Sequence, residues 1–247
     1  MDNALLRPRF DWPTIAFALV YPSVLTFIYF LWLKNAPEFT QQSAYGVGKA
    51  IQFGLPLVWV GLVLRERLRW PKFSASGLAT GILFGLVAGG SMLALYFGWL
   101  RSSGEFATSA AAMKERLAKI GVYTPTIYAT VALFYSLMHS LLEEYYWRWF
   151  VFGRLKKLTP LWPAILISAV GFMGHHVIVL GTYFGWGSIW TWFFSLATAF
   201  GGAVWAWLYN RSGSIYGPWM SHLLIDAAIF GIGYDLMRCA TVAARAT

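Results

Sequence analysis

Residues 161–183 read LWPAILISAVGFMGHHVIVLGTY and contain no Asp, Glu, Lys or Arg. A segment of this length matches the roughly 20 apolar residues that a helix needs to cross a bilayer. Inside lipid, every backbone N–H and C=O group must be satisfied within the segment, so residues 161–183 are predicted to form a transmembrane helix. The adjacent histidines of this helix, His175 and His176, are candidates for function because ionisable groups are costly inside a membrane.

The rest of the chain has the same character, which indicates a polytopic membrane protein. Of its 247 residues, 58% are hydrophobic and 12% are charged, about half the usual charge content of a soluble domain. The expected fold is an all-α transmembrane helix bundle that forms a single membrane domain over residues 1–247. Its spans number about seven and are placed at residues 13–33, 45–64, 77–100, 126–152, 161–183, 187–209 and 214–235.

The positive charges are predicted to set the orientation. Lys and Arg are more frequent in the connections that lie on the same side of the membrane as the N-terminus than in those on the opposite side. This bias places the N-terminus in the cytoplasm. The net charge of +9 is therefore assigned to membrane topology, and no nucleic-acid partner is expected. The connection from residue 101 to residue 123 mixes apolar and charged positions at helical spacing, so we expect an amphipathic helix in the membrane interface.

A stripe of small residues marks the third span. Gly77, Gly81, Gly85 and Gly89 recur every four residues and therefore share one helix face. Such a stripe allows two helices to approach closely. We expect it to pack inside the bundle, with a homodimer seam as the alternative.

Ionisable residues inside the spans are concentrated in the second half of the chain. Lys49 lies near the start of its predicted helix and is expected to snorkel to the interface. Spacing of four residues places Glu144 with Arg148, Phe172 with His176, and His222 with Asp226 on common helix faces. At about 1.5 Å of rise per residue, the three pairs lie deep enough to converge near mid-membrane. The full set comprises His139, Glu143, Glu144, Arg148, His175, His176, His222 and Asp226.

Three short motifs in this set resemble a known family. Residues Glu143-Glu144-x-x-x-Arg148, Phe172-x-x-x-His176 and His222-x-x-x-Asp226 occur in this order on successive late helices. They are similar to the three motifs of the CPBP family, the CAAX proteases and bacteriocin-processing enzymes. The resemblance covers a motif-bearing catalytic core at residues 125–235.

The resemblance implies a glutamic-type intramembrane endopeptidase acting on a membrane-associated or lipidated peptide. In the family, the residues corresponding to Glu143 and His176 activate a water molecule, and His222 is expected to stabilise the oxyanion. Glu144, Arg148 and Phe172 would support these groups, with Arg148 neutralising Glu144 and Phe172 aiming His176.

The roles of Asp226, His175 and His139 are predicted separately. Asp226 stands where many family members carry Asn, and an ionised Asp cannot donate to an oxyanion. We expect Asp226 to accept from His222 and fix its tautomer, or to act in its protonated form. His175 is expected to point away from His176 and bond a neighbouring helix, and His139 to tune Glu143 or bind a metal.

Other functions remain open from the sequence. No cofactor is expected, but Glu143, Glu144, His176 and His222 could hold one divalent metal ion, although the HExxH and HxxEH patterns are absent. Asp226 and Asp235 lie on one predicted helix, which argues against an aspartyl protease. A membrane scaffold or immunity protein of the same family is the non-enzymatic alternative. The expected partners are the lipid bilayer and a membrane peptide substrate, and the expected location is a bacterial inner membrane.

Overall fold

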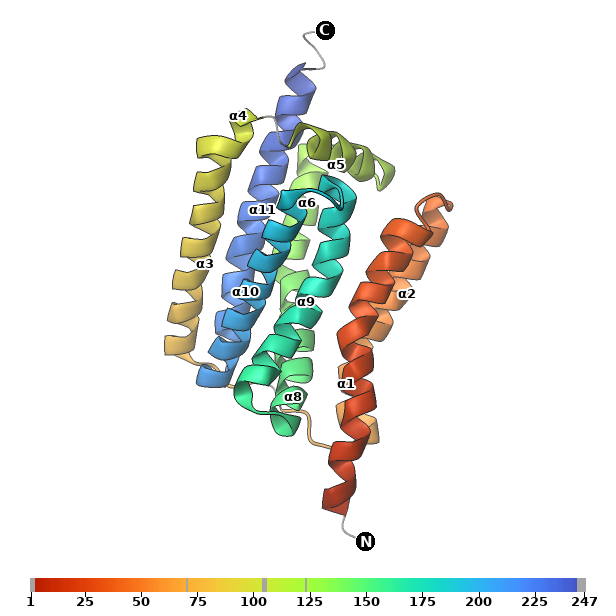
Figure 1. The fold of residues 1–247 in the computed structure, drawn as a ribbon, viewed down its shortest axis with the longest axis vertical. Coiled ribbons are helices and arrows are strands. Elements are labelled where there is room, and N and C mark those ends of the chain that lie inside the picture. The colour runs from red at the N-terminus through yellow and green to blue at the C-terminus, as the bar shows by residue number, and fades with distance from the viewer. Residues whose placement is uncertain (1–2, 70, 104–105, 123, 244–247) are drawn as a thin grey trace.

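The regular structure of the chain is helical. The computed structural model describes residues 3–69, 71–103, 106–122 and 124–243, and within these ranges it contains helices and no strands. Long helical segments run alternately up and down the bundle, so α1 begins at one end and α11 finishes at the other (Figure 1). The predicted all-α bundle is confirmed.

Several spans combine α-helical and π-helical segments. The first three are α1 (Asn3–Phe27) with η1 (Ile28–Trp32), α2 (Glu38–Leu57) with η2 (Val58–Val63), and α3 (Ala75–Leu95) with η3 (Tyr96–Leu100) and α4 (Arg101–Ser103). The fourth comprises α6 (Pro125–Phe134), η4 (Tyr135–His139), α7 (Ser140–Glu144), η5 (Tyr145–Phe152) and α8 (Gly153–Leu158). The last three are α9 (Leu161–Phe184), α10 (Ile189–Ser212) and α11 (Tyr216–Ala243).

Six of these spans are long and apolar enough to cross a membrane. They occupy residues 11–32, 38–63, 75–103, 125–158, 161–184 and 189–212 of the part described, and each overlaps a predicted span. The helix α11, which carries His222, Asp226 and Asp235, is not among the six. Its role as a seventh span stays a prediction.

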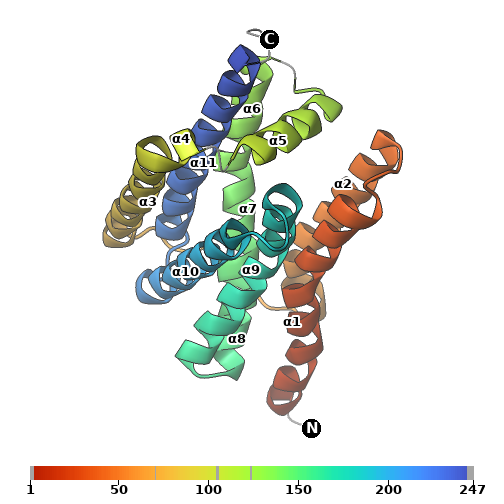
Figure 2. The same cartoon turned by 45° about the horizontal axis from the view of Figure 1, so that its top comes forward.

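The helix α5 (Ala107–Lys119) lies across one end of the bundle, at a steep angle to the spans (Figures 1 and 2). Glu115 and Lys119 are exposed, whereas Ser109 and Ala110 are buried. The Ser109 hydroxyl donates to the carbonyl of Tyr183 at 3.0 Å, which fixes α5 to the end of α9. The predicted amphipathic helix is therefore present, although residues 104, 105 and 123 of that connection lie outside the described residues.

The glycine stripe of α3 packs against α11 of the same chain. All four glycines of the stripe are buried. A Cβ atom added at Gly81 would lie 2.1 Å from the carbonyl oxygen of Gly217, and one added at Gly85 would lie 2.9 Å from Cα of Ser221. Only glycine permits this approach, so the expected close packing inside the bundle is confirmed.

At the opposite end from α5, a buried arginine joins three segments. Arg154 of α8 donates to Asp11 of α1 at 2.7 Å and to Glu66, in the loop after η2, at 2.9 Å. Partial burial raises the pKa of Glu66, but the hydrogen bond from Arg154 and the charges of Arg154 and Lys157 outweigh it and hold the pKa below its usual value. Glu66 is therefore ionised at neutral pH and compensates the charge of Arg154.

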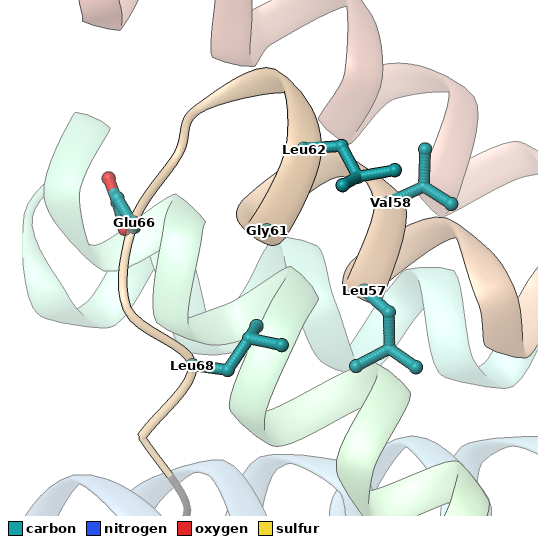
Figure 3. Close-up of a pocket in the computed structure, with 6 residues that line it drawn as sticks. All are labelled: Leu57, Val58, Gly61, Leu62, Glu66 and Leu68. Atoms are coloured by element: carbon teal, nitrogen blue, oxygen red, sulfur yellow. The ribbon is translucent and has the colours of Figure 1, made fainter.

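An open cavity of about 510 Å³ lies beside this loop. Figure 3 shows that Glu66 points away from the apolar side chains that line it, which include Leu57, Leu62 and Leu68. None of the ionisable residues singled out inside the spans lines this cavity. It is therefore separate from the candidate site described below.

We predict that Gly81→Ala destabilises the protein by about 1–3 kcal/mol, because a methyl group at this position overlaps the backbone of α11. Thermal unfolding of the purified protein in detergent measures the effect. Gly90→Ala is the matched control on the same helix, because a Cβ atom at Gly90 has no neighbour within 4 Å. Equal melting temperatures for the two variants would contradict the close approach of α3 and α11.

Candidate active site

The polar side chains of the three motifs meet inside the bundle. The helix α7 supplies Glu143 and Glu144, which are 3% and 0% exposed. Adjacent residues of an α-helix point about 100° apart, so two buried neighbours must face different partners. Glu143 faces the histidines of α9, whereas Glu144 faces Arg148 and α11. The two carboxylates therefore have different environments.

Glu144 is held on both oxygens. Its Oε2 lies 3.1 Å from Nε of Arg148, and its Oε1 lies 2.9 Å from Nδ1 of His222. The guanidinium of Arg148 is also buried and lies over the rings of Phe172, at 4.7 Å, and Trp205, at 5.0 Å. The predicted pairing of Glu144 with Arg148 is present, and it extends to a third helix through His222.

His222 is oriented by Glu144. A carboxylate paired with arginine is ionised and can only accept, so Nδ1 of His222 carries the proton of this hydrogen bond. The opposite nitrogen, Nε2, lies 3.8 Å from Oε2 of Glu143 and 3.6 Å from Oδ1 of Asp226. The distance to Asp226 is too long for a hydrogen bond. In this structure the imidazole tautomer is thus set by Glu144, not by Asp226 as the sequence suggested.

The ring of His222 also has an aromatic support. Trp205 of α10 stacks on it with ring centroids 4.3 Å apart and an interplanar angle of 18°. The indole N–H of Trp205 donates to the hydroxyl of Ser221 at 2.9 Å, which fixes the position of the indole. No sequence motif marks Trp205, because its role depends on the packing of α10 against α11.

Glu143 lies next to several imidazoles. Its Oε1 is 3.4 Å from Nε2 of His175 and 3.9 Å from Nε2 of His139. His175 contacts a neighbouring helix, as expected, and its partner there is Glu143; its ring also lies parallel to Trp147 at 6.1 Å. His139 is close to Glu143, as expected from one turn of spacing.

His176 is fixed by its own helix. Its Nδ1 lies 3.0 Å from the carbonyl oxygen of Phe172, and the two rings are 4.7 Å apart. A carbonyl oxygen only accepts, so Nδ1 carries the proton and the neutral ring keeps a free lone pair on Nε2. Phe172 thus orients His176 through both its backbone and its ring.

One group of side chains could approach a metal ion. Glu143, His175 and His176 each offer a ligand atom, and these atoms lie within 4.8 Å of one another. This set differs from the one considered from the sequence, because Glu144 and His222 bind each other. Ligand atoms around a tetrahedral zinc ion lie about 3.3 Å apart, and Oε1 of Glu143 and Nε2 of His175, 3.4 Å apart, are already close to this spacing.

Comparison with known proteins supports the motif assignment. Residues 125–228 match the protein-family model described as type II CAAX prenyl endopeptidase Rce1-like. The matched segment contains all three motifs, and within it the resemblance to the CPBP family is confirmed. No curated protein and no solved structure matches the chain. At the level of the family, the match supports a CAAX-type intramembrane protease.

We predict that Arg148→Met lowers the free energy of unfolding by about 3–5 kcal/mol, because it leaves the buried carboxylate of Glu144 without its cation. The double variant Glu144→Gln/Arg148→Met removes both charges and should be more stable than Arg148→Met. Denaturation of the two single variants and the double variant in detergent measures the coupling. Additive losses would show that the ion pair does not carry the stability.

Proposed function

We propose that this chain is a glutamic-type intramembrane endopeptidase that hydrolyses a peptide bond of a membrane-associated or lipidated substrate. The observation that carries the proposal is the difference between the two adjacent carboxylates. Glu144 is bound by Arg148 and His222, whereas Glu143 lies more than 3 Å from every imidazole beside it. Glu143 therefore keeps lone pairs for a water proton.

In the proposed reaction, water binds between Glu143 and Nε2 of His176. Glu143 takes a proton from this water as its oxygen attacks the carbonyl carbon of the substrate, so that a C–O bond forms and the carbonyl oxygen becomes an oxyanion. Collapse of the tetrahedral intermediate breaks the C–N bond. The proton on Glu143 then passes to the leaving amine, which balances the hydrolysis.

His222 is proposed to stabilise the oxyanion through Nε2. Because Nδ1 already donates to Glu144, donation from Nε2 requires the imidazole to be cationic in this step. In its ionised form Asp226, with Oδ1 at 3.6 Å from Nε2, supplies a negative charge next to that cation. This gives Asp226 a role without requiring it to donate a hydrogen bond.

The proposed substrate is a membrane peptide, because the reacting groups lie within the membrane-spanning bundle. The prenylated class named in the family description is one candidate among lipidated peptides. We further propose a cytoplasmic N-terminus, on the basis of the charge distribution, and a bacterial inner-membrane location.

We predict that Glu143→Ala and His176→Ala each reduce peptide cleavage by at least about 100-fold, because each removes a group that acts on the attacking water. Purified protein in proteoliposomes is incubated with membrane-tethered and lipidated peptides, and the products are identified by mass spectrometry. Glu115→Ala, on the exposed side of α5, is the matched control and should retain wild-type activity.

Full activity in either variant would exclude the proposed mechanism. A membrane scaffold would be favoured if the wild type cleaved no peptide of a broad panel and the Glu143→Gln variant still bound a protein partner. Membrane insertion of each variant is verified by its extraction with detergent and its elution on size-exclusion chromatography.

A metal-dependent hydrolase is the second candidate, favoured by the grouping of Glu143, His175 and His176. We propose that Glu143 and His176 activate water without a metal, so that the free Nε2 of His176 faces the attacking water and not an ion. Protein dialysed against a chelator is therefore expected to keep its activity, with metal content measured by mass spectrometry. Loss of activity that Zn²⁺ restores would establish the metal-dependent mechanism instead.

A further inference from the structure

Lys49 is a cation inside a span, and no carboxylate of the described residues is in contact with it. It lies in α2, within the candidate span 38–63, and its side chain is half-buried. Its ammonium lies 5.2 Å from the ring centroid of Phe53 and 5.5 Å from that of Tyr45. Among the described residues, no carboxylate comes within ion-pair distance of it. The sequence predicted that Lys49 snorkels, yet it is held between two rings of its own helix.

These two rings face the interior of the bundle. Phe53 lies 6.2 Å from the ring of His139, whose Nε2 is 3.9 Å from Oε1 of Glu143. Tyr45 lies 4.5 Å from Tyr29 at the end of the first span. Lys49 is therefore one aromatic ring away from the candidate active site, and its charge interacts with that of Glu143 over this distance.

A second cation, Arg116, lies beside Tyr29, the aromatic neighbour of Tyr45. The guanidinium of Arg116, on α5, stacks over Tyr29 at 4.5 Å, and its Nη1 donates to Gln41 at 3.1 Å. Arg116 and Gln41 line a cavity of about 370 Å³ between α5 and the connection of the first two spans, together with two lysines, Lys34 and Lys119, and one carboxylate, Glu38. Cations thus outnumber carboxylates around this cavity, and Tyr29 and Tyr45 connect Arg116 with Lys49.

An ammonium that has no carboxylate in contact with it is costly inside a membrane, and its presence points to an anionic ligand. Aromatic faces attract a cation but leave its hydrogen-bond donors unused. A carboxylate would satisfy both the charge and the donors. Glu143 and Asp226 would repel such a group at the reacting bond itself, so it must lie to the α2 side of that bond.

We propose that Lys49 is a specificity-determining residue that binds a carboxylate of the peptide substrate on the α2 side of the scissile bond. The inference rests on the proposed peptidase function and assigns part of its substrate preference. The carboxylate has two possible sources, the free C-terminus of the peptide and an acidic side chain near it. Either one would reach Lys49 from the cavity at Arg116.

The test uses full-length protein in proteoliposomes and a membrane-tethered peptide that the wild type cleaves. Four forms of the peptide are compared, which combine a free or amidated C-terminus with Glu or Gln at a position after the scissile bond. We expect Lys49→Gln to raise KM about tenfold or more for the peptide forms that carry the carboxylate bound by Lys49, with little change in kcat. For peptide forms without that carboxylate, the same variant should change KM by a much smaller factor.

Two further variants serve as controls. Lys49→Arg keeps the positive charge and should retain the preference for the carboxylate, whereas Lys72→Gln, in an exposed loop, should behave as the wild type. Which pair of peptides responds identifies the source of the carboxylate.

Two results would overturn the inference while leaving the proposed function intact. One is a wild type that cleaves all four peptide forms equally well. The other is a Lys49→Gln variant that loses activity to the same extent on all four, which would mean that Lys49 acts on Glu143 alone. If the wild type cleaves no peptide in any form, the proposed function itself fails.

Discussion

The carboxylate of Glu144 is the constraint on which the site depends. It is fully buried, with Nε of Arg148 at 3.1 Å from one oxygen and Nδ1 of His222 at 2.9 Å from the other. One charge thereby fixes a guanidinium on its own helix and an imidazole on α11. A buried ionised group without such partners would be strongly destabilising. Through His222, Glu144 also positions one of the imidazoles beside Glu143.

Much of this arrangement could be predicted from the sequence, for two physical reasons. Apolar runs in a bilayer allow almost no structure except the helix, so the spans follow from composition. Spacing of four residues then places Glu144 beside Arg148 and Phe172 beside His176 whatever the surrounding bundle. Such contacts lie within one helix and need no knowledge of which helices are neighbours.

The contacts between helices could not be predicted in this way. The approach of His175 to Glu143, the stacking of Trp205 on His222 and the inward position of Lys49 all depend on how the helices are rotated against each other. Arg154 shows the same limitation. Its charge reads as a topology signal in the sequence, but the side chain is buried between Asp11 and Glu66.

The contact between the glycine stripe of α3 and the helix α11 limits how the sequence of such a chain can change. The helix α11 carries His222, yet the surface that supports it comes from α3, outside the matched residues 125–228. Asp11 and Glu66, which bind Arg154, also lie outside that segment. The portion recognisable by its motifs is therefore smaller than the portion that must fold together. The first three spans can therefore vary in sequence as long as they keep the glycine stripe that contacts α11 and the two acidic residues that bind Arg154 of α8.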